Sequence, residues 1–142
     1  MKENDLINTQ RLTKQSLNKH WLVLGALLAG TAVILGAFAA HGLSTILTAS
    51  QLTTFETAVR YQMYHGLALL LLPTLSDYVA PKWLKRVAVS FCCGCLLFSA
   101  SLYLLVLTGA KWFGPITPLG GVLFIVGWAL LTIGLLKGRS HD

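Results

Sequence analysis

The sequence has 142 residues, of which 55% are apolar and only 11% are charged, a balance that excludes an ordinary soluble globular domain. The formal net charge is +6, but the basic residues lie at the ends of apolar runs rather than in one aromatic-rich patch, which argues against a nucleic-acid partner. Composition therefore predicts one all-α integral membrane domain whose surroundings are the lipid bilayer.

Residues 1–20 are polar and mixed in charge, which predicts a cytoplasmic polar tail or at most a surface helix. The first membrane helix is predicted over residues 21–41. Its basic leader resembles a signal peptide, but the apolar run is longer than the roughly 7–15 residues of a signal-peptide core, so we expect a retained helix. Ala32, Gly36 and Ala40 recur every four residues, a spacing of small side chains that predicts close packing against a neighbouring helix.

The second helix is predicted over residues 54–78, after an uncharged polar connection. Thr53 and Glu56 have the spacing of a capping box, in which the Thr caps the helix and the Glu side chain reaches back to the backbone. Pro73 is expected to kink this helix because proline lacks the backbone N–H of the ladder.

A short basic turn then leads to a third helix over residues 87–108, and a loop precedes a fourth over residues 119–136. Gly120, Gly127 and Gly134 repeat every seven residues and predict a packing groove on one face. Nine of the eleven Lys and Arg residues fall in the N-terminal tail, the basic turn or the C-terminus. The positive-inside rule therefore predicts a four-helix transmembrane bundle over residues 21–142, with both termini cytoplasmic.

Polar side chains gather at the start of the second helix. Glu56 and Arg60 are four residues apart and share a helical face, Tyr64 follows one turn later, and Tyr61 and His65 form an adjacent stripe. Ionisable groups cost a few kcal/mol at the bilayer centre, so this cluster is a candidate site. Two interpretations stay open: mutual neutralisation of the charges near the outer interface, or a proton, ion or ligand site. The full candidate cluster is His41, Glu56, Arg60, Tyr61, Tyr64 and His65.

Cofactor chemistry has little support in the sequence. His41 and His65 offer a haem b alternative, but a helix that starts at Thr53 puts His65 about 18 Å along its axis, whereas His41 ends the preceding helix. Cys92, Cys93 and Cys95 lie in an apolar run without an accompanying His or acid, which favours packing over metal binding. No cofactor, metal site or catalytic residue is predicted.

Four stretches together resemble one family: GAFAAHGL over residues 36–43, FETAVRYQMYH over 55–65, FSASLY over 98–103 and GPITPLGG over 114–121. In order and spacing they are similar to the family of unknown function number 423, which includes YgdD-like small inner-membrane proteins and eukaryotic transmembrane protein 256 relatives. The resemblance covers nearly everything after Trp21. It implies a small multi-pass bacterial inner-membrane protein without an established activity.

The favoured functional hypothesis is a non-enzymatic accessory or scaffold component of a membrane complex, because the chain combines small-residue stripes with no evident nucleophile. Its partner is expected to be another membrane protein or further copies of the chain. One alternative is a small oligomeric transporter or channel that uses Glu56, Arg60 and His65. Another is a haem or quinone redox module built on His41 and His65.

Overall fold

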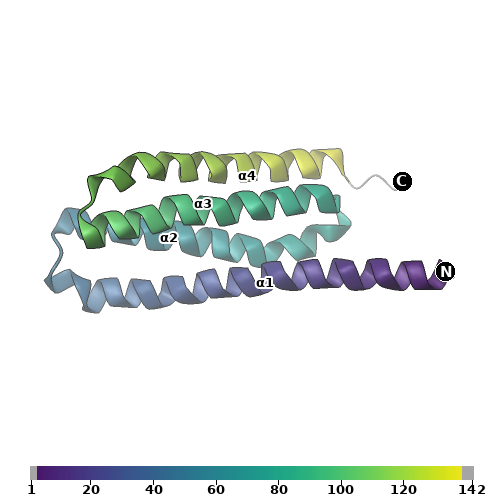
Figure 1. The fold of residues 1–142 in the computed structure, drawn as a ribbon, viewed down its shortest axis with the longest axis horizontal. Coiled ribbons are helices and arrows are strands. Elements are labelled where there is room, and N and C mark those ends of the chain that lie inside the picture. Colours follow the sequence, from purple (N-terminus) through teal and green to yellow (C-terminus); the bar gives the residue numbers. More distant parts are fainter. Residues whose placement is uncertain (1–2, 139–142) are drawn as a thin grey trace.

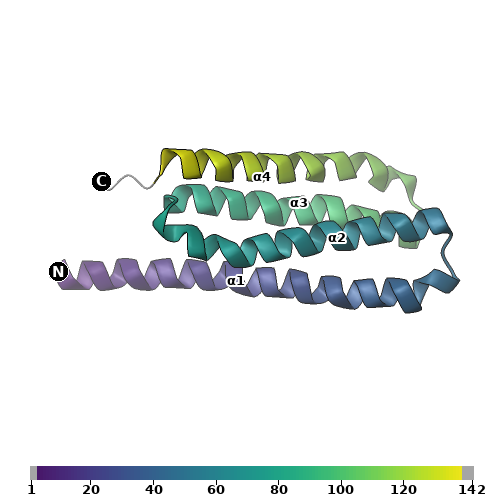
Figure 2. The same ribbon diagram turned by 180° about the vertical axis from the view of Figure 1, so that it is seen from behind.

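The structure is a computed structural model that describes the backbone of residues 3–138 and the side chains of residues 19–138. Within these residues four α-helices follow one another: α1 (Glu3–His41), α2 (Ala49–Leu71), α3 (Pro81–Thr108) and α4 (Thr117–Lys137). Short 3₁₀ helices at Leu43–Thr45, Leu72–Asp77 and Lys111–Ile116 join them. α2 packs against both α1 and α3, α4 packs against α3, and α1 and α4 form the two opposite edges (Figures 1 and 2). The predicted all-α fold with four helices is confirmed for the described residues.

The first helix is longer than the sequence pattern suggested. Its backbone is helical from Glu3, and its first turns extend beyond the ends of the other helices (Figure 1). The backbone is therefore already helical before residue 21, where a change from polar tail to helix was expected. The physical reason is that residues 3–24 contain neither proline nor glycine, so nothing in the backbone interrupts a helix whose later turns pack against α2.

The second helix begins at an earlier cap than predicted. Thr48 is the N-cap: its side-chain oxygen accepts a hydrogen bond from the Gln51 backbone N–H at 3.3 Å, while the Gln51 side chain accepts one from the Thr48 N–H at 3.0 Å. The predicted cap at Thr53 is wrong, since Thr53 lies inside the helix and bonds back to the Ala49 carbonyl. At the other end the α-helix stops at Leu71, just before Pro73, and a 3₁₀ turn continues the chain.

The third and fourth helices also start earlier than expected. Pro81 occupies the first turn of α3, where its missing N–H costs nothing, so the predicted basic turn is helical. Gly109 ends α3 with φ of 70°, a left-handed conformation that favours glycine. Much of the predicted loop that follows is the 3₁₀ helix Lys111–Ile116, and α4 begins at Thr117.

Glycines and aromatic rings interlock between α3 and α4. A Cβ placed on Gly120 would lie 2.3 Å from the Phe98 backbone nitrogen, and one on Gly127 would lie 2.5 Å from the Phe91 ring. At Gly134 it would lie 2.9 Å from the Val79 side chain, and Trp83 is also in contact. The glycines that repeat every seven residues on α4 therefore face bulky side chains at similar spacing on α3.

The contact between α1 and α2 uses only part of the predicted stripe of small residues. Ala32 is fully buried and a Cβ built on Gly36 would lie 3.4 Å from the Val59 side chain, but Ala40 is exposed. Gly25 is also tightly packed, since a Cβ there would lie 2.8 Å from the Gly66 carbonyl oxygen. The small residues of α1 that are buried or partly buried recur at intervals of four, three, four and three residues, the spacing of a packed helix pair: Gly25, Ala29, Ala32, Gly36 and Ala39.

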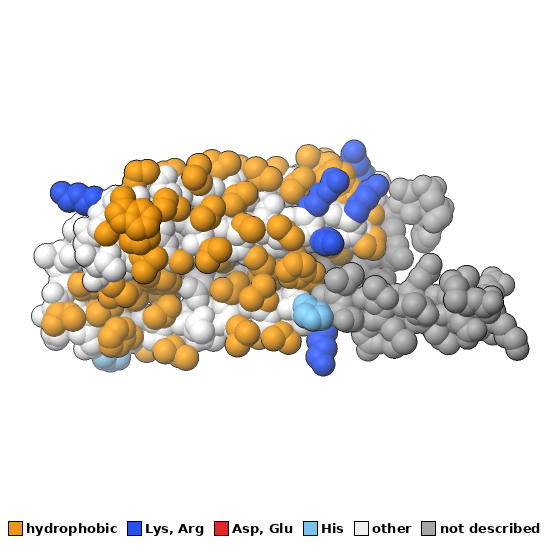
Figure 3. All heavy atoms as spheres, in the orientation of Figure 1, with side chains coloured by type: hydrophobic (Ala, Val, Ile, Leu, Met, Phe, Trp, Pro, Cys, Tyr) orange, Lys and Arg blue, Asp and Glu red, His pale blue; other side chains and the backbone are white. Residues whose placement is uncertain are grey.

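Three helical segments are long and apolar enough to cross a membrane: Lys19–Thr45, Pro81–Thr108 and Lys111–Lys137. On the face seen in Figure 3 the middle of the molecule is largely hydrophobic, and Lys and Arg side chains gather toward one end, with a single one at the other. α2 does not reach the same hydropathy, because its first four turns carry many polar side chains.

Candidate functional site

The polar half of α2 divides between two sides of the helix. Gln62 and His65 are buried, at 6% and 3% exposure, whereas Glu56, Arg60 and Tyr64 are exposed. The sequence pattern placed five of the polar groups on one continuous surface. The structure instead separates an inward group that contacts the other helices from an outward group that faces away from them.

Gln62 is the centre of the inward group, and sequence reasoning did not single it out. Its amide nitrogen donates to the Leu28 carbonyl at 2.9 Å and to Thr31 Oγ1 at 2.8 Å, both on α1. Its amide oxygen accepts from the Tyr103 hydroxyl of α3 at 3.0 Å. Thr31 Oγ1 gives its own proton to the Leu27 carbonyl at 2.7 Å, which leaves it free to accept. One side chain of α2 therefore joins both neighbouring helices.

His65 makes the corresponding connection to α4. The Trp128 indole N–H lies 3.2 Å from His65 Nε2, and His65 Nδ1 lies 2.8 Å from the Tyr61 carbonyl oxygen. Because indole only donates, Nε2 must accept, so the proton resides on Nδ1 and is donated to Tyr61. The imidazole also stacks on Phe124 at a centroid distance of 3.6 Å and an interplanar angle of 8°. Both ring nitrogens of a neutral histidine are thus engaged.

These contacts fix the level of the polar residues along the bundle. Thr31 and Trp128 lie near the middle of the candidate spans Lys19–Thr45 and Lys111–Lys137, so Gln62 and His65 lie near the middle as well. Val59 contacts Gly36, which is five residues or about 8 Å beyond Thr31. The neighbouring Arg60 therefore lies within the length of the apolar helices rather than beyond their ends.

Glu56, Arg60 and Tyr64 form the outward group, which we call the α2 polar face. Among the described residues no ion pair joins Glu56 to Arg60; Arg60 donates instead to Thr57 Oγ1 at 3.3 Å. Tyr64 is 56% exposed. Tyr61 lies between the two groups, 39% exposed, with its ring 4.7 Å from that of Phe98. Of the two interpretations left open by the sequence, mutual neutralisation therefore has no ion pair between Glu56 and Arg60 to support it among the described residues.

The two histidines of the haem alternative are not brought together. His41 is exposed at the end of α1, whereas His65 is buried sixteen residues into α2, about 24 Å from the start of that helix. Among the described residues no cluster of three or more His, Cys, Asp or Glu side chains has the geometry of a metal site. Of the cysteines, Cys93 is exposed on α3, Cys92 is partly buried and Cys95 is buried.

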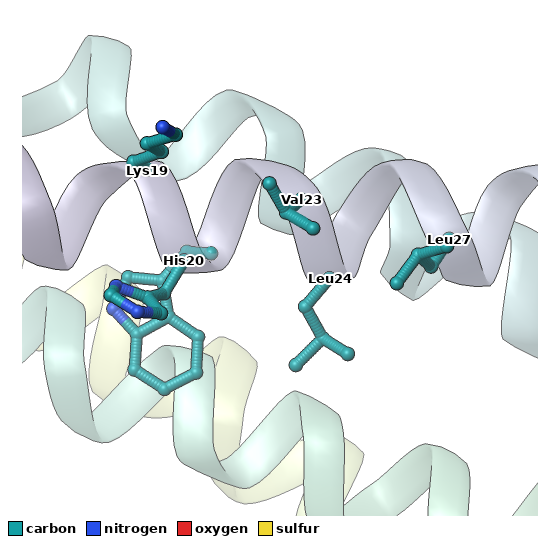
Figure 4. A pocket seen from close by; sticks show the side chains of 6 residues that line it. Lys19, His20, Val23, Leu24 and Leu27 are labelled. Carbon is teal, nitrogen blue, oxygen red and sulfur yellow. The ribbon is translucent and has the colours of Figure 1, made fainter.

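A shallow apolar groove runs along the start of the first candidate span (Figure 4). Its lining residues all belong to α1: Lys19, His20, Trp21, Val23, Leu24 and Leu27. Since it lies in the middle of α1, at least 14 residues from His41, and contains no residue of α2, the groove is separate from the polar groups described above.

Comparison with known proteins identifies the family. The profile of the family described as "Protein of unknown function (DUF423)" matches residues 35–121, which include His41 and the polar half of α2. The chain belongs to this family. No solved structure matches it.

Relatives of this DUF423 protein are named as membrane proteins. The UPF0382 membrane protein of Staphylococcus saprophyticus is 48% identical over 119 residues, which cover 84% of this chain and 98% of the relative. That of Staphylococcus aureus strain RF122 is 46% identical over 121 residues, covering 84% and 97%. That of Haemophilus influenzae is 42% identical over 124 residues, covering 87% and 99%. Together with the three apolar helices, these names make the DUF423 protein a membrane protein, and none of them states an activity.

Proposed function

We propose that this DUF423 protein crosses the membrane four times and acts as a non-enzymatic accessory subunit that assembles laterally through the α2 polar face. The observation that carries the proposal is the exposure of Glu56, Arg60 and Tyr64 within the length of the apolar helices. The inward polar groups are already bonded to protein partners. The outward groups, Glu56, Arg60 and Tyr64, instead face away from the other helices, toward the bilayer.

The crossing of the membrane by α2 is supported by its packing. It lies between α1 and α3, and its central residues Gln62 and His65 bond to groups near the middle of two candidate spans. In a bilayer, its backbone groups are satisfied by the helix itself. The last six residues of α2 are apolar, so the polarity that lowers its hydropathy is confined to residues 49–65.

The orientation follows from the basic residues. Lys82, Lys85 and Arg86 at the start of α3 lie at the same end as Lys137 of α4, and Lys111 lies at the other end. The positive-inside rule then assigns the first end to the cytoplasm, with both termini on that side. The polar half of α2 belongs to the opposite half of the bilayer.

Lateral assembly is favoured by the energetics of the α2 polar face. An arginine facing lipid at the centre of a bilayer costs about 2.5–3.5 kcal/mol on insertion scales, an aspartate has a similar cost, and the cost falls toward the interface. Arg60, about 8 Å from the middle of the first candidate span, bears more of this cost than Glu56, which lies one turn nearer the end of that span. Arg60 lowers part of this cost by reaching toward Thr57, away from the midplane. Pairing with charges on another transmembrane helix removes more of it, so the exposed pair supports a surface that is covered by a protein partner.

The transporter alternative has less support. A pathway for ions or substrates needs polar atoms that face a cavity, whereas Gln62 and His65 direct theirs at Thr31, Tyr103 and Trp128. The described groove is apolar and involves only α1. The accessory role requires no such cavity.

The test is co-purification from the native host in a mild detergent, followed by native mass spectrometry. We expect the chain, of 15.4 kDa, to appear in a larger assembly. A variant that combines Glu56→Gln and Arg60→Gln should lose that assembly, because it removes the charges a partner would pair with. Lys111→Gln is the matched control, since it removes an exposed charge at the end of the bundle. A wild-type chain that is monomeric both in detergent and in lipid nanodiscs contradicts the proposal.

A further inference from the structure

Seven of the exposed residues of α2 share one face along the whole helix and form a stripe. Spaced by four, three, four, four, three and four residues, they are Ala49, Thr53, Glu56, Arg60, Tyr64, Leu67 and Leu71. The first half of the stripe is polar with small residues, and the second half ends in leucines. Two charged side chains in this stripe, Glu56 and Arg60, set it apart from an ordinary lipid-facing surface.

We propose that the occupant of the α2 polar face is α2 of a second copy of the chain. The inference rests on the proposed lateral assembly and names its partner. Two copies inserted in the same direction are related by a twofold axis along the membrane normal, so their α2 helices run parallel and identical residues lie at equal depth. The face must then be complementary to itself.

The charges of the stripe meet that condition. Glu56 and Arg60 carry opposite charges and are four residues, or about 6 Å, apart along the helix. Side chains of a helix lean toward its N-terminus, and the bond from Arg60 to Thr57 shows that this guanidinium does so. Arg60 of each copy therefore reaches the level of Glu56 of the other. The two resulting ion pairs form a group of four charges with no net charge.

The remaining residues of the stripe fit the same arrangement. Ala49 and Thr53 are small enough to let the two helices approach at the end of α2 that carries the charges. Leu67 and Leu71, 47% and 61% exposed, supply apolar contact at the other end. A different membrane protein would have to provide both opposite charges at the matching depths, whereas a second copy supplies them by symmetry.

Charge reversal tests this pairing directly. Copies with two different affinity tags are co-expressed and reconstituted in nanodiscs, and association is measured by co-purification and by fluorescence energy transfer. We expect Glu56→Arg alone and Arg60→Glu alone to weaken self-association about tenfold or more, because each places four like charges at the interface. Mixing the two single variants should restore association, since each supplies the charge that the other lacks. The double variant that carries both changes should also associate with itself.

The controls separate folding from pairing. Lys111→Glu reverses an exposed charge outside the stripe and should leave association unchanged. If the mixed pair and the double variant stay apart while another membrane protein still co-purifies with the wild type, the second copy is not the occupant, although lateral assembly holds. A wild-type chain that associates neither with itself nor with another protein overturns both proposals.

Discussion

A close backbone contact between α3 and α4 gives a sharp prediction for stability. Gly120 of α4 lies against the α3 backbone, where a Cβ would be 2.3 Å from the Phe98 nitrogen and 2.8 Å from the Leu97 carbonyl carbon. Backbone atoms cannot rotate away as a flexible side chain can. Gly120→Ala must therefore push α4 away from α3 by about 1 Å to reach an ordinary van der Waals distance, and such overpacking costs about 1–3 kcal/mol.

Gly30→Ala is the matched control for this substitution. Gly30 lies in the middle of α1, and a Cβ built there meets nothing within 4 Å. Both changes replace glycine by alanine inside a helix, which by itself stabilises the helix by about 1 kcal/mol. The difference in unfolding free energy between the two variants therefore measures the cost of placing a Cβ between α4 and α3.

Thermal unfolding followed by circular dichroism in one detergent, with chemical unfolding to obtain free energies, measures that difference. We expect Gly120→Ala to be less stable than Gly30→Ala by about 1–3 kcal/mol. The separation should also lengthen the 2.7 Å contact between the hydroxyls of Ser101 and Thr117, which bridges the two helices. If Gly120→Ala is as stable as Gly30→Ala, the interlocking of α3 and α4 described above is incorrect.

Two further predictions concern the hydrogen bonds of the inward group and the orientation of the chain in the membrane. Tyr103→Phe removes the donor to the Gln62 amide oxygen and should destabilise the protein by about 0.6–2 kcal/mol in a chemical unfolding experiment, while Tyr78→Phe, at an exposed ring, should have no effect. In a cysteine-free background, Ser44→Cys should react with a membrane-impermeant maleimide on intact cells, whereas Lys82→Cys should react only after the membrane is opened. The reverse labelling pattern would contradict the proposed orientation.

The sequence was informative where a single physical constraint dominates. The charge-free runs that flank Lys111 are longer than a bilayer requires, and both are helical in the structure. Boundaries were less certain because local signals compete. Thr48 and Thr53 both precede a Gln or Glu at the capping-box spacing, and the earlier one is used. Starting there lengthens the helix and lets Leu52 pack beside Phe55 in the core at this end of the bundle.

The division of the polar cluster was not predictable from α2 alone. Adjacent positions in a helix differ by about 100°, so Tyr61 and Gln62 point in different directions, but which direction is inward depends on the other helices. α2 lacks the uniform apolar face that usually settles this question, because a buried glutamine and a buried histidine interrupt it. Gln62 escaped notice since a lone amide has no motif. Its importance comes from the donors and acceptors of α1 and α3.

The inward group and the α2 polar face are linked through the rotation of α2 about its own axis. Gln62 is bonded to α1 and α3, and His65 to α4, so these two side chains fix the rotation of α2 about its own axis. That rotation alone decides whether Glu56 and Arg60 face a neighbouring molecule or the core. A turn of one residue position would bury a charge without a partner, which is costlier than any one of the hydrogen bonds that prevent it. In the proposed assembly the buried polar groups act without touching the partner: they hold the exposed charges in the direction from which a second helix can approach.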